Sequence, residues 1–259
     1  MQYQNLVLER AGSKGILTFV REERLNALDS RTFNEIIAAI DELDADESVQ
    51  VIIITGRGRG FVAGADINEY VDRTLLDYVN FQRLGRRMYD RIESLRKPVI
   101  AAVNGFALGG GFELVLVADI VVAAESAQMG LPEVKLGLLP GGGGTQRITR
   151  LVGRNKAKEL LMTGDFLSAQ QAHDLGIVNH VVPDADLMAF TLELADRICK
   201  RAPLAVQMAK QLVNDGLNAS LPTAITQEMG MTATLYMTDD AREGISAFLQ
   251  KRKPKFQGH

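Results

Sequence analysis

The sequence predicts an α/β fold followed by a small all-helical region. Apolar, often β-branched runs alternate with helical patterns over the first half of the chain, which is typical of α/β proteins. Three helical patterns then follow at residues 202–217, 222–236 and 239–251, with no strand between them. The length of 259 residues is close to what one hydrophobic core supports. We therefore predict one large domain over residues 1–196 and a helical region over residues 197–259.

Short strands and longer helices are predicted in turn along the first half of the chain. Apolar runs bounded by turn residues predict the strands, and apolar side chains at helical spacing predict the helices. The predicted strands are residues 5–10 and 14–21, which form a hairpin around Gly12 and Ser13, and then residues 49–55, 98–104 and 119–124. The predicted helices are residues 30–43 with Ser30 as the N-cap, 66–70, 75–95 and 109–118, with a loop at 57–61.

Composition and charge exclude several classes of protein. The chain has 29 Lys and Arg against 32 Asp and Glu, so it lacks the basic surplus typical of nucleic-acid-binding proteins. Its one cysteine, Cys199, cannot form an internal disulfide, which favours a reducing compartment. No apolar stretch approaches the roughly 18 residues of a membrane-spanning helix, and the N-terminus has no signal-peptide pattern. We expect a cytoplasmic protein without membrane or nucleic-acid partners.

Glycine is over-represented and clustered at residues 56–60, 109–111 and 141–144. None of these clusters is a dinucleotide-binding or P-loop motif. The third glycine of G-x-G-x-x-G would fall on Phe61 or Leu114, and Gly143 stands where a P-loop needs lysine. The sequence has no G-x-S-x-G, and its three histidines form no H-E-x-x-H. Nicotinamide, nucleoside-triphosphate, serine-hydrolase and zinc chemistry are therefore not indicated.

The glycine triplet at 109–111 precedes Glu113 at the start of a predicted helix. The first N–H groups of a helix lack partners within it, and glycines let a ligand approach them closely. The helix dipole adds a positive field, which suits an anion or an oxygen that becomes negative during a reaction. The spacing of these residues alone leaves two interpretations open. Either the triplet is a cradle with Glu113 as a working carboxylate, or the glycines serve packing and Glu113 compensates the dipole.

A second carboxylate, Glu133, follows Pro132 among apolar residues. Proline at this point favours the start of a helical turn. Two carboxylates beside N–H groups can divide general acid and general base work when their surroundings separate their pKa values. Surface acids are also common in first turns, because they compensate the helix dipole there. The residues alone leave both interpretations of Glu133 open.

Seven motifs are spread over the whole chain. They are RLNAL at 24–28, FVAGADI at 61–67, PVIAAVNGFALGGG at 98–111, GGGGTQR at 141–147, LMTG at 161–164, the segment 169–176 and REGISAFLQKR at 242–252. As a set they closely resemble the crotonase family, the enoyl-CoA hydratase/isomerase superfamily. The resemblance implies a crotonase-like spiral of ββα units with a C-terminal helical trimerisation region. It also implies a homo-oligomer, either a trimer or a dimer of trimers.

The resemblance further implies an activity and the residues that perform it. Hydratases of the family carry two glutamates in the contexts GGGxE and PE, which here are Glu113 and Glu133. As base and acid, these would catalyse the reversible syn addition of water to a trans-2-enoyl-CoA, with the N–H groups of Ala65 and Gly110 as the oxyanion hole. No metal or cofactor is implied, since coenzyme A is part of the substrate. The residues implied to contact the CoA ester are Arg24, Leu25, Ala63, Gly64, Asp66, Ile67 and Asn68, with Lys255 and Phe256 reaching the CoA of a neighbouring subunit.

Four places depart from the family pattern. Residues 20–23 read VREE where relatives commonly have Asn-Arg-Pro and a charged residue, and Asn68 stands where some hydratases carry lysine. Gln257 likewise replaces a frequent lysine. These differences reduce the contacts expected with the CoA phosphates and adenine. Gly142 replaces a frequent alanine, for which we expect no consequence.

Two other functions remain as alternatives. A Δ3,Δ2-enoyl-CoA isomerase of the same superfamily would use one glutamate to move a proton. Some relatives bind AU-rich RNA, for which the basic segments 83–87 and 251–255 would be the candidates. The net negative charge favours ordinary solvated surfaces at both segments. Pocket depth is expected to depend on residues around 70–87 and on Phe112, but the sequence indicates no acyl-chain length.

Overall fold

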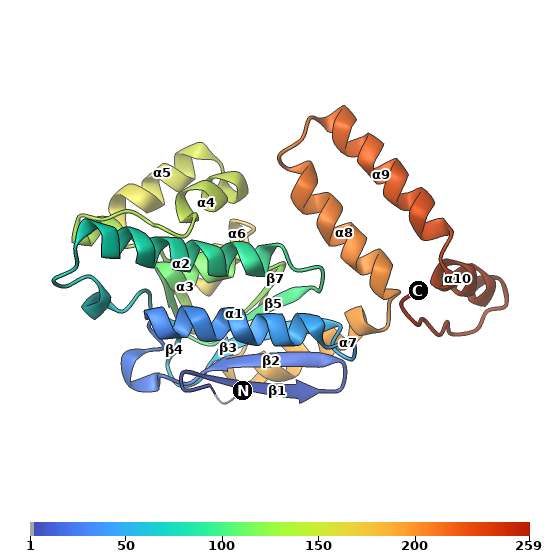
Figure 1. Ribbon diagram of the computed structural model, residues 1–259, viewed down its shortest axis with the longest axis horizontal. Coiled ribbons are helices and arrows are strands. Elements are labelled where there is room, and N and C mark those ends of the chain that lie inside the picture. Colours follow the sequence, from blue (N-terminus) through green and yellow to red (C-terminus); the bar gives the residue numbers. More distant parts are fainter. Residues whose placement is uncertain (1–2) are drawn as a thin grey trace.

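Six strands form the main β-sheet of the computed structural model, which describes residues 3–259 (Figure 1). Their order is β1-β2-β3-β5-β7-β10. The first pair is antiparallel and forms the predicted hairpin, and every later pair is parallel. The strands are β1 (Leu6–Ala11), β2 (Lys14–Phe19), β3 (Val51–Gly56), β5 (Val99–Val103), β7 (Ile120–Ala124) and β10 (His180–Val182).

The main sheet is covered by helices on both faces. Ile52 and Ile54 of β3 belong to the larger hydrophobic core, which also contains apolar residues of α1 (Ser30–Ala45) and α2 (Leu75–Glu93). Val51 and Ile53 point to the opposite face and pack in a second core with α7 (Leu187–Cys199). Successive strand residues face opposite sides of a sheet, so the continuous apolar run of β3 is explained by burial on both faces.

A second sheet of four very short strands lies next to the cavity described below. Its order is β4-β6-β8-β9. The sequence analysis missed this sheet and took residues 57–61 as a loop, which is wrong because β4 begins at Gly60. Strands of two or three residues are too short to display an alternating pattern. They are β4 (Gly60–Val62), β6 (Phe106–Leu108), β8 (Gln128–Gly130) and β9 (Leu167–Ser168).

The two sheets are built by a repeated strand-strand-helix unit. β3, β4 and α2 form one unit, and β5, β6 and α3 (Gly110–Val117) form the next. In each, the first strand joins the large sheet and the second joins the small one. This repeat confirms the predicted spiral of ββα units. The remaining helices of the large domain are α4 (Gly144–Val152), α5 (Arg154–Thr163) and α6 (Ala169–Asp174).

The N-cap of the first helix lies one residue before the predicted one. Asp29, not Ser30, is the N-cap of α1, because the Asp29 carboxylate accepts a hydrogen bond from the Thr32 N–H at 2.7 Å. Ser30 is the first helical residue, and its hydroxyl donates to Glu69 at 2.9 Å. The side chain of Ser30 therefore connects α1 to the segment that follows β4.

Three helices extend from the body at the C-terminal end, as the orange to red ribbon in Figure 1 shows. They are α8 (Pro203–Gly216), α9 (Leu221–Tyr236) and α10 (Asp239–Leu249), in agreement with the sequence prediction. Within the described chain, no residue of α8 or α9 is buried. The division at residues 196 and 197 stays a prediction, and α7 runs through it. No helix among residues 3–259 is long and apolar enough to cross a membrane.

Candidate active site

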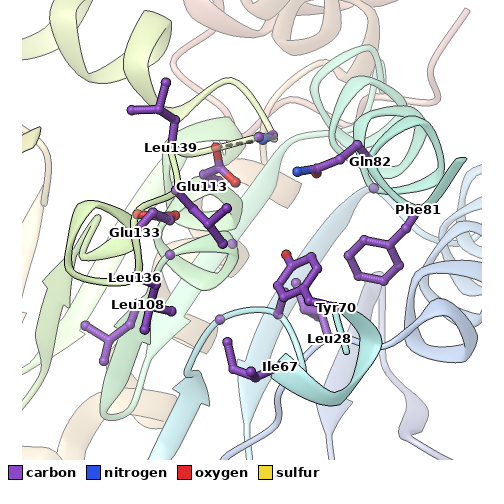
Figure 2. Close-up of a pocket in the computed structure, with 18 of the residues that line it drawn as sticks. Leu28, Ile67, Tyr70, Phe81, Gln82, Leu108, Glu113, Glu133, Leu136 and Leu139 are labelled. Atoms are coloured by element: carbon purple, nitrogen blue, oxygen red, sulfur yellow. Dashed lines mark hydrogen bonds between the residues drawn. The ribbon is translucent and has the colours of Figure 1, made fainter. Parts of the chain in front are cut away.

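A cavity of about 170 Å³ lies where the small sheet meets α2 and α3 (Figure 2). Three glycine-containing segments reach it, at residues 63–65, 109–110 and 141–142. Both candidate glutamates, Glu113 and Glu133, line the cavity together with the candidate oxyanion-hole residues Ala65 and Gly110. The fold thus brings together four residues from three separate segments of the sequence.

The Ala65 N–H is directed into this region by the backbone around it. The Leu28 N–H donates to the Gly64 carbonyl at 2.8 Å, and the Asp66 N–H donates to the Leu28 carbonyl at 2.8 Å. These two bonds hold the chain on each side of Ala65. Gly64 has a φ of +108°, a conformation that side-chain-bearing residues rarely adopt. Among residues 3–259, no acceptor takes a bond from the Ala65 N–H.

The glycine triplet starts α3 with its free N–H groups at the cavity. Gly109 has a φ of +52° and is the N-cap, so Gly110 supplies the first helical N–H. A Cβ at Gly110 would lie 3.9 Å from the Ala65 nitrogen, which places the two N–H groups close together. A Cβ at Gly111 would overlap the Val62 carbonyl. Each glycine of the triplet therefore has its own role. Gly109 adopts the turn conformation, Gly110 leaves access to the N–H groups, and Gly111 allows close packing against Val62.

Glu113 is buried at 3% exposure and is held by two backbone N–H groups. The Gly142 N–H donates to its Oε1 at 2.8 Å, and the Gly144 N–H donates to the same oxygen at 2.7 Å. Burial raises the pKa of Glu113, while these two bonds oppose the rise because they favour the ionised form. Oε2 accepts no hydrogen bond from the described residues, so it can accept a proton from a bound molecule.

Glu133 has a different environment in the same cavity. It begins a short 3₁₀ turn, Glu133–Leu136, directly after Pro132. Its Oε2 is buried and has no hydrogen-bond partner among the residues that the structure describes. Burial, together with the nearby charge of Glu113, raises the pKa of Glu133 to about 7. A buried carboxyl oxygen without a partner is costly, so this one calls for a functional explanation.

The loop at residues 141–144 is part of the site, because its N–H groups bind Glu113. The expectation that glycine in place of alanine at residue 142 has no consequence is wrong. A Cβ at Gly142 would overlap the Tyr89 ring and lie 2.6 Å from Glu113 Oε2. Arg147 anchors the loop by donating to the Gly142 carbonyl at 2.7 Å, and its guanidinium pairs with Glu93 at 2.6 Å.

Tyr89 of α2 is a residue that the sequence analysis missed. Its hydroxyl donates to the Gly110 carbonyl at 2.8 Å, and its ring lies against Gly142. It therefore contacts both the start of α3 and the loop that binds Glu113. The helical spacing of α2 could assign Tyr89 to an apolar face, but it could not show what that face meets. The segment 70–87, on which pocket depth was expected to depend, does supply cavity residues: Tyr70, Tyr78, Phe81 and Gln82. Phe112, named with that segment, is buried and is not among the lining residues.

The residues implied to contact the CoA ester fall into two groups. Ala63, Gly64 and Ile67 line the cavity. Asp66 lies beside it and pairs with Arg21 at 3.0 Å. Burial opposes ionisation of Asp66, but hydrogen bonds from Arg21 and Asn68 outweigh it and lower the pKa of this carboxyl. The other implied residues outside the cavity lining are Arg24, Leu25 and Asn68.

Lys255 and Phe256 lie in the segment after α10 and are not among the residues that line the cavity of their own chain. Figure 1 shows the chain ending near α10, outside the body of the molecule. The Lys255 N–H donates to Glu243 at 2.8 Å, and the Phe256 ring packs against Gly244. A contact of these residues with the CoA of a neighbouring subunit stays a prediction. No group of three or more His, Cys, Asp or Glu side chains in the described part of the chain could hold a metal ion.

Comparison with known proteins extends the similarity over nearly the whole chain. The sequence model of the family "Enoyl-CoA hydratase/isomerase" matches residues 10–259. A short-chain-enoyl-CoA hydratase of Clostridium acetobutylicum is 42% identical over 98% of this chain and 97% of its own length. A 2,3-dehydroadipyl-CoA hydratase of Escherichia coli is 40% identical over 98% of each chain.

A solved structure extends the agreement from sequence to fold. The crystal structure of an enoyl-CoA hydratase subunit from Geobacillus kaustophilus superimposes with a TM-score of 0.96 at 42% identity, covering 100% of both chains. The ββα repeat, the C-terminal helices and the full-length similarity thus agree. The chain belongs to the enoyl-CoA hydratase/isomerase family.

Proposed function

We propose that this protein is an enoyl-CoA hydratase, a lyase that reversibly adds water to a trans-2-enoyl-CoA and gives a 3-hydroxyacyl-CoA. The observation that carries the proposal is the pair of glutamates, Glu113 and Glu133, in one cavity with the N–H groups of Ala65 and Gly110. Hydration needs a base for the water, an acid for the carbon and donors for the carbonyl oxygen. The cavity supplies one candidate for each requirement.

The thioester carbonyl oxygen binds between the N–H groups of Ala65 and Gly110. As water attacks C3, the electrons of the C2=C3 bond move toward the carbonyl, and negative charge develops on its oxygen. Preorganised donors at that point stabilise the transition state by about 3 kcal/mol each. No metal or cofactor is required in this scheme, because the thioester itself accepts the electrons.

The two glutamates divide the proton transfers. Glu113 takes one proton from the attacking water, because the N–H groups of Gly142 and Gly144 favour its ionised form. Glu133 donates a proton to C2, since a pKa of about 7 keeps much of it protonated near neutral pH. One water held by both side chains places its oxygen and the new proton on the same face of the double bond. The addition is therefore syn.

The CoA portion would follow the segment from Ala63 to Asn68 out of the cavity. We propose that Arg24, Leu25, Ala63, Gly64, Asp66, Ile67 and Asn68 contact it, and that Lys255 and Phe256 contact the CoA of a neighbouring subunit. A homo-oligomer, as a trimer or a dimer of trimers, would cover the apolar side chains exposed on α8 and α9. A cytoplasmic location is consistent with the single cysteine.

Hydration of crotonyl-CoA by the purified protein tests the proposal. The conjugated enoyl absorbance should disappear, and 3-hydroxybutyryl-CoA should be identified by mass spectrometry. An unchanged absorbance would contradict the proposal. Conversion of a 3-enoyl-CoA to its 2-enoyl isomer, without hydration, would instead support the Δ3,Δ2-enoyl-CoA isomerase alternative.

A further inference from the structure

The cavity has an exposed rim and a buried inner end. At the rim, Ile67 is 52% exposed and Leu136 is 63% exposed. Phe81 and Tyr89, which line the other side, are each 3% exposed. The CoA portion is large and charged, so burying it would be costly and it must stay at the rim. The acyl group of a bound ester therefore points toward the inner end.

Aromatic rings from α1, α2 and the segment before α2 close this inner end; Figure 2 labels Tyr70 and Phe81 among them. The ring centres of Tyr70 and Phe81 are 5.5 Å apart, and those of Phe33 and Phe81 are 5.2 Å apart. Tyr78 extends the row, with its ring centre 5.6 Å from that of Tyr70. We name these four residues the aromatic wall: Phe33, Tyr70, Tyr78 and Phe81.

The wall has little room to move. A Cβ at Gly85 would lie 3.1 Å from the Phe33 ring, so this ring rests directly on the backbone of α2. The Tyr78 hydroxyl accepts a hydrogen bond from Gln82 at 2.7 Å, which fixes the outer end of the row. Phe33 and Phe81 are buried, Tyr70 and Tyr78 are partly buried, and buried rings in mutual contact move aside only by displacing their neighbours. The wall therefore acts as a stop for the acyl chain.

The volume of the cavity sets the length of the chain that fits. A cavity of roughly 150 Å³ lined by apolar side chains holds a benzene molecule. The volume here, about 170 Å³, is similar. It therefore accommodates a group of about four to six carbons. A ten-carbon chain would have to push the wall aside.

The charges near the wall exclude a substrate with a terminal carboxylate. Two cations lie nearby, and each already has a carboxylate partner. Arg73 stacks over the Phe81 ring and pairs with Glu69, while Arg86 at the edge of the cavity pairs with Asp90 at 2.6 Å. A carboxylate at the end of the acyl chain would meet no unpaired cation among the described lining residues, only the uncharged rings and hydroxyls of the wall and the Gln82 amide.

We propose that the aromatic wall restricts this site to short, uncharged acyl groups of about four to six carbons. The proposal rests on the proposed hydratase function for the identity of the substrate. It assigns the wall as the determinant of acyl-chain length, and Tyr78, which is partly buried, and Phe81, which is buried, are the two positions at which we test it.

The test measures both turnover and binding, so that the two proposals can fail separately. For turnover, kcat/KM is compared for crotonyl-CoA, trans-2-decenoyl-CoA and 2,3-dehydroadipyl-CoA. We expect both longer substrates to be poorer than crotonyl-CoA by about tenfold or more. For binding, calorimetry compares butyryl-CoA with decanoyl-CoA, which cannot be hydrated. We expect decanoyl-CoA to gain no affinity over butyryl-CoA.

Two variants then remove parts of the wall. Tyr78→Ala and Phe81→Ala should each raise the decenoyl-to-crotonyl ratio of kcat/KM about tenfold and tighten decanoyl-CoA binding. Tyr78 is only partly buried, so its truncation spares the fold. Tyr3→Ala is the matched control, because Tyr3 is partly buried far from the cavity, and its ratio should stay unchanged.

Each result has one meaning. Equal kcat/KM for crotonyl-CoA and decenoyl-CoA, or unchanged ratios in both wall variants, would overturn the length limit. Efficient turnover of 2,3-dehydroadipyl-CoA would overturn the exclusion of charged chains. If no enoyl-CoA is hydrated, the proposed function fails. The binding comparison would still decide the length limit, because tighter binding of decanoyl-CoA than of butyryl-CoA to the wild type contradicts it.

Discussion

Two short segments present a glutamate to the same cavity in opposite ways. The loop at 141–144 binds Glu113 through two N–H groups at 2.7 and 2.8 Å. The turn at Glu133–Leu136 leaves Glu133 Oε2 buried without a partner in the described chain. The difference shows that the surroundings of each glutamate, and not the residue type, set its pKa. Burial raises the pKa of both carboxyls, but two N–H donors oppose that rise at Glu113, whereas the charge of Glu113 adds to it at Glu133.

Removal of either carboxylate should have the largest effect on activity, because it abolishes one of the two proton-transfer groups. Glu113→Gln removes the base, and Glu133→Gln removes the acid, with little change in side-chain volume. Each should lower kcat for crotonyl-CoA hydration by about 10²–10⁴-fold, while the Kd for butyryl-CoA changes little. Glu228→Gln, at an exposed position of α9, serves as the control. Near-normal turnover in either cavity variant would remove that residue from the mechanism.

A methyl group at Gly142 should disturb the surroundings of Glu113 and leave those of Glu133 unchanged. Gly142→Ala should displace the Tyr89 ring and Glu113 Oε2, because a Cβ has no space there. Misplacing a catalytic group by about 1 Å costs on the order of a hundredfold in rate. Steady-state kinetics should find this loss in kcat. Gly230→Ala is the control, since nothing lies within 4 Å of a Cβ at that position. Full activity of Gly142→Ala would contradict the tight fit around Glu113.

Loss of the Tyr89 hydroxyl should have a smaller effect. Tyr89→Phe keeps the ring against Gly142 and removes the 2.8 Å hydrogen bond to the Gly110 carbonyl. We regard Tyr89 as a positioning residue for the start of α3. One such bond is worth about 1 kcal/mol, so kcat should fall about fivefold while KM stays constant. Tyr3→Phe should change neither constant. A change confined to KM would assign Tyr89 to substrate binding instead.

The smallest expected effect concerns stability rather than activity. Glu133 has a pKa raised from 4.5 to about 7 in the folded protein. Between these values the folded state holds a proton that the unfolded state has lost, so this group makes stability fall as pH rises, and the loss is complete above about pH 7. The Tm of the wild type relative to Glu133→Gln should therefore drop by several degrees between pH 5 and pH 8. A constant difference would contradict the raised pKa.

The sequence predicted the parts of this site that depend on local pattern. The helix at Gly110, the turn after Pro132 and the hairpin near the N-terminus follow from glycine, proline and apolar periodicity. Family resemblance, rather than spacing, singled out Glu113 and Glu133 as a pair. The short strands of the second sheet were missed, because two or three residues display no periodicity.

Long-range contacts account for the other omissions. The bonds from the 141–144 loop to Glu113 join residues about thirty positions apart, and nothing in either segment indicates the other. The same holds for the Tyr89 bond to Gly110 and for the aromatic wall, whose members come from α1, α2 and the segment before α2. Such contacts depend on how the elements pack, which no local pattern contains.

The most direct test of the central claim is a titration of the glutamate side chains by ¹³C NMR in the free enzyme. The Glu133→Gln and Glu113→Gln variants assign the two signals. We predict that the signal absent from Glu133→Gln titrates with a pKa of about 7, well above the ordinary value of 4.5. If this signal titrates near 4.5, Glu133 is ionised at neutral pH, and the division of proton transfers between the two glutamates is contradicted.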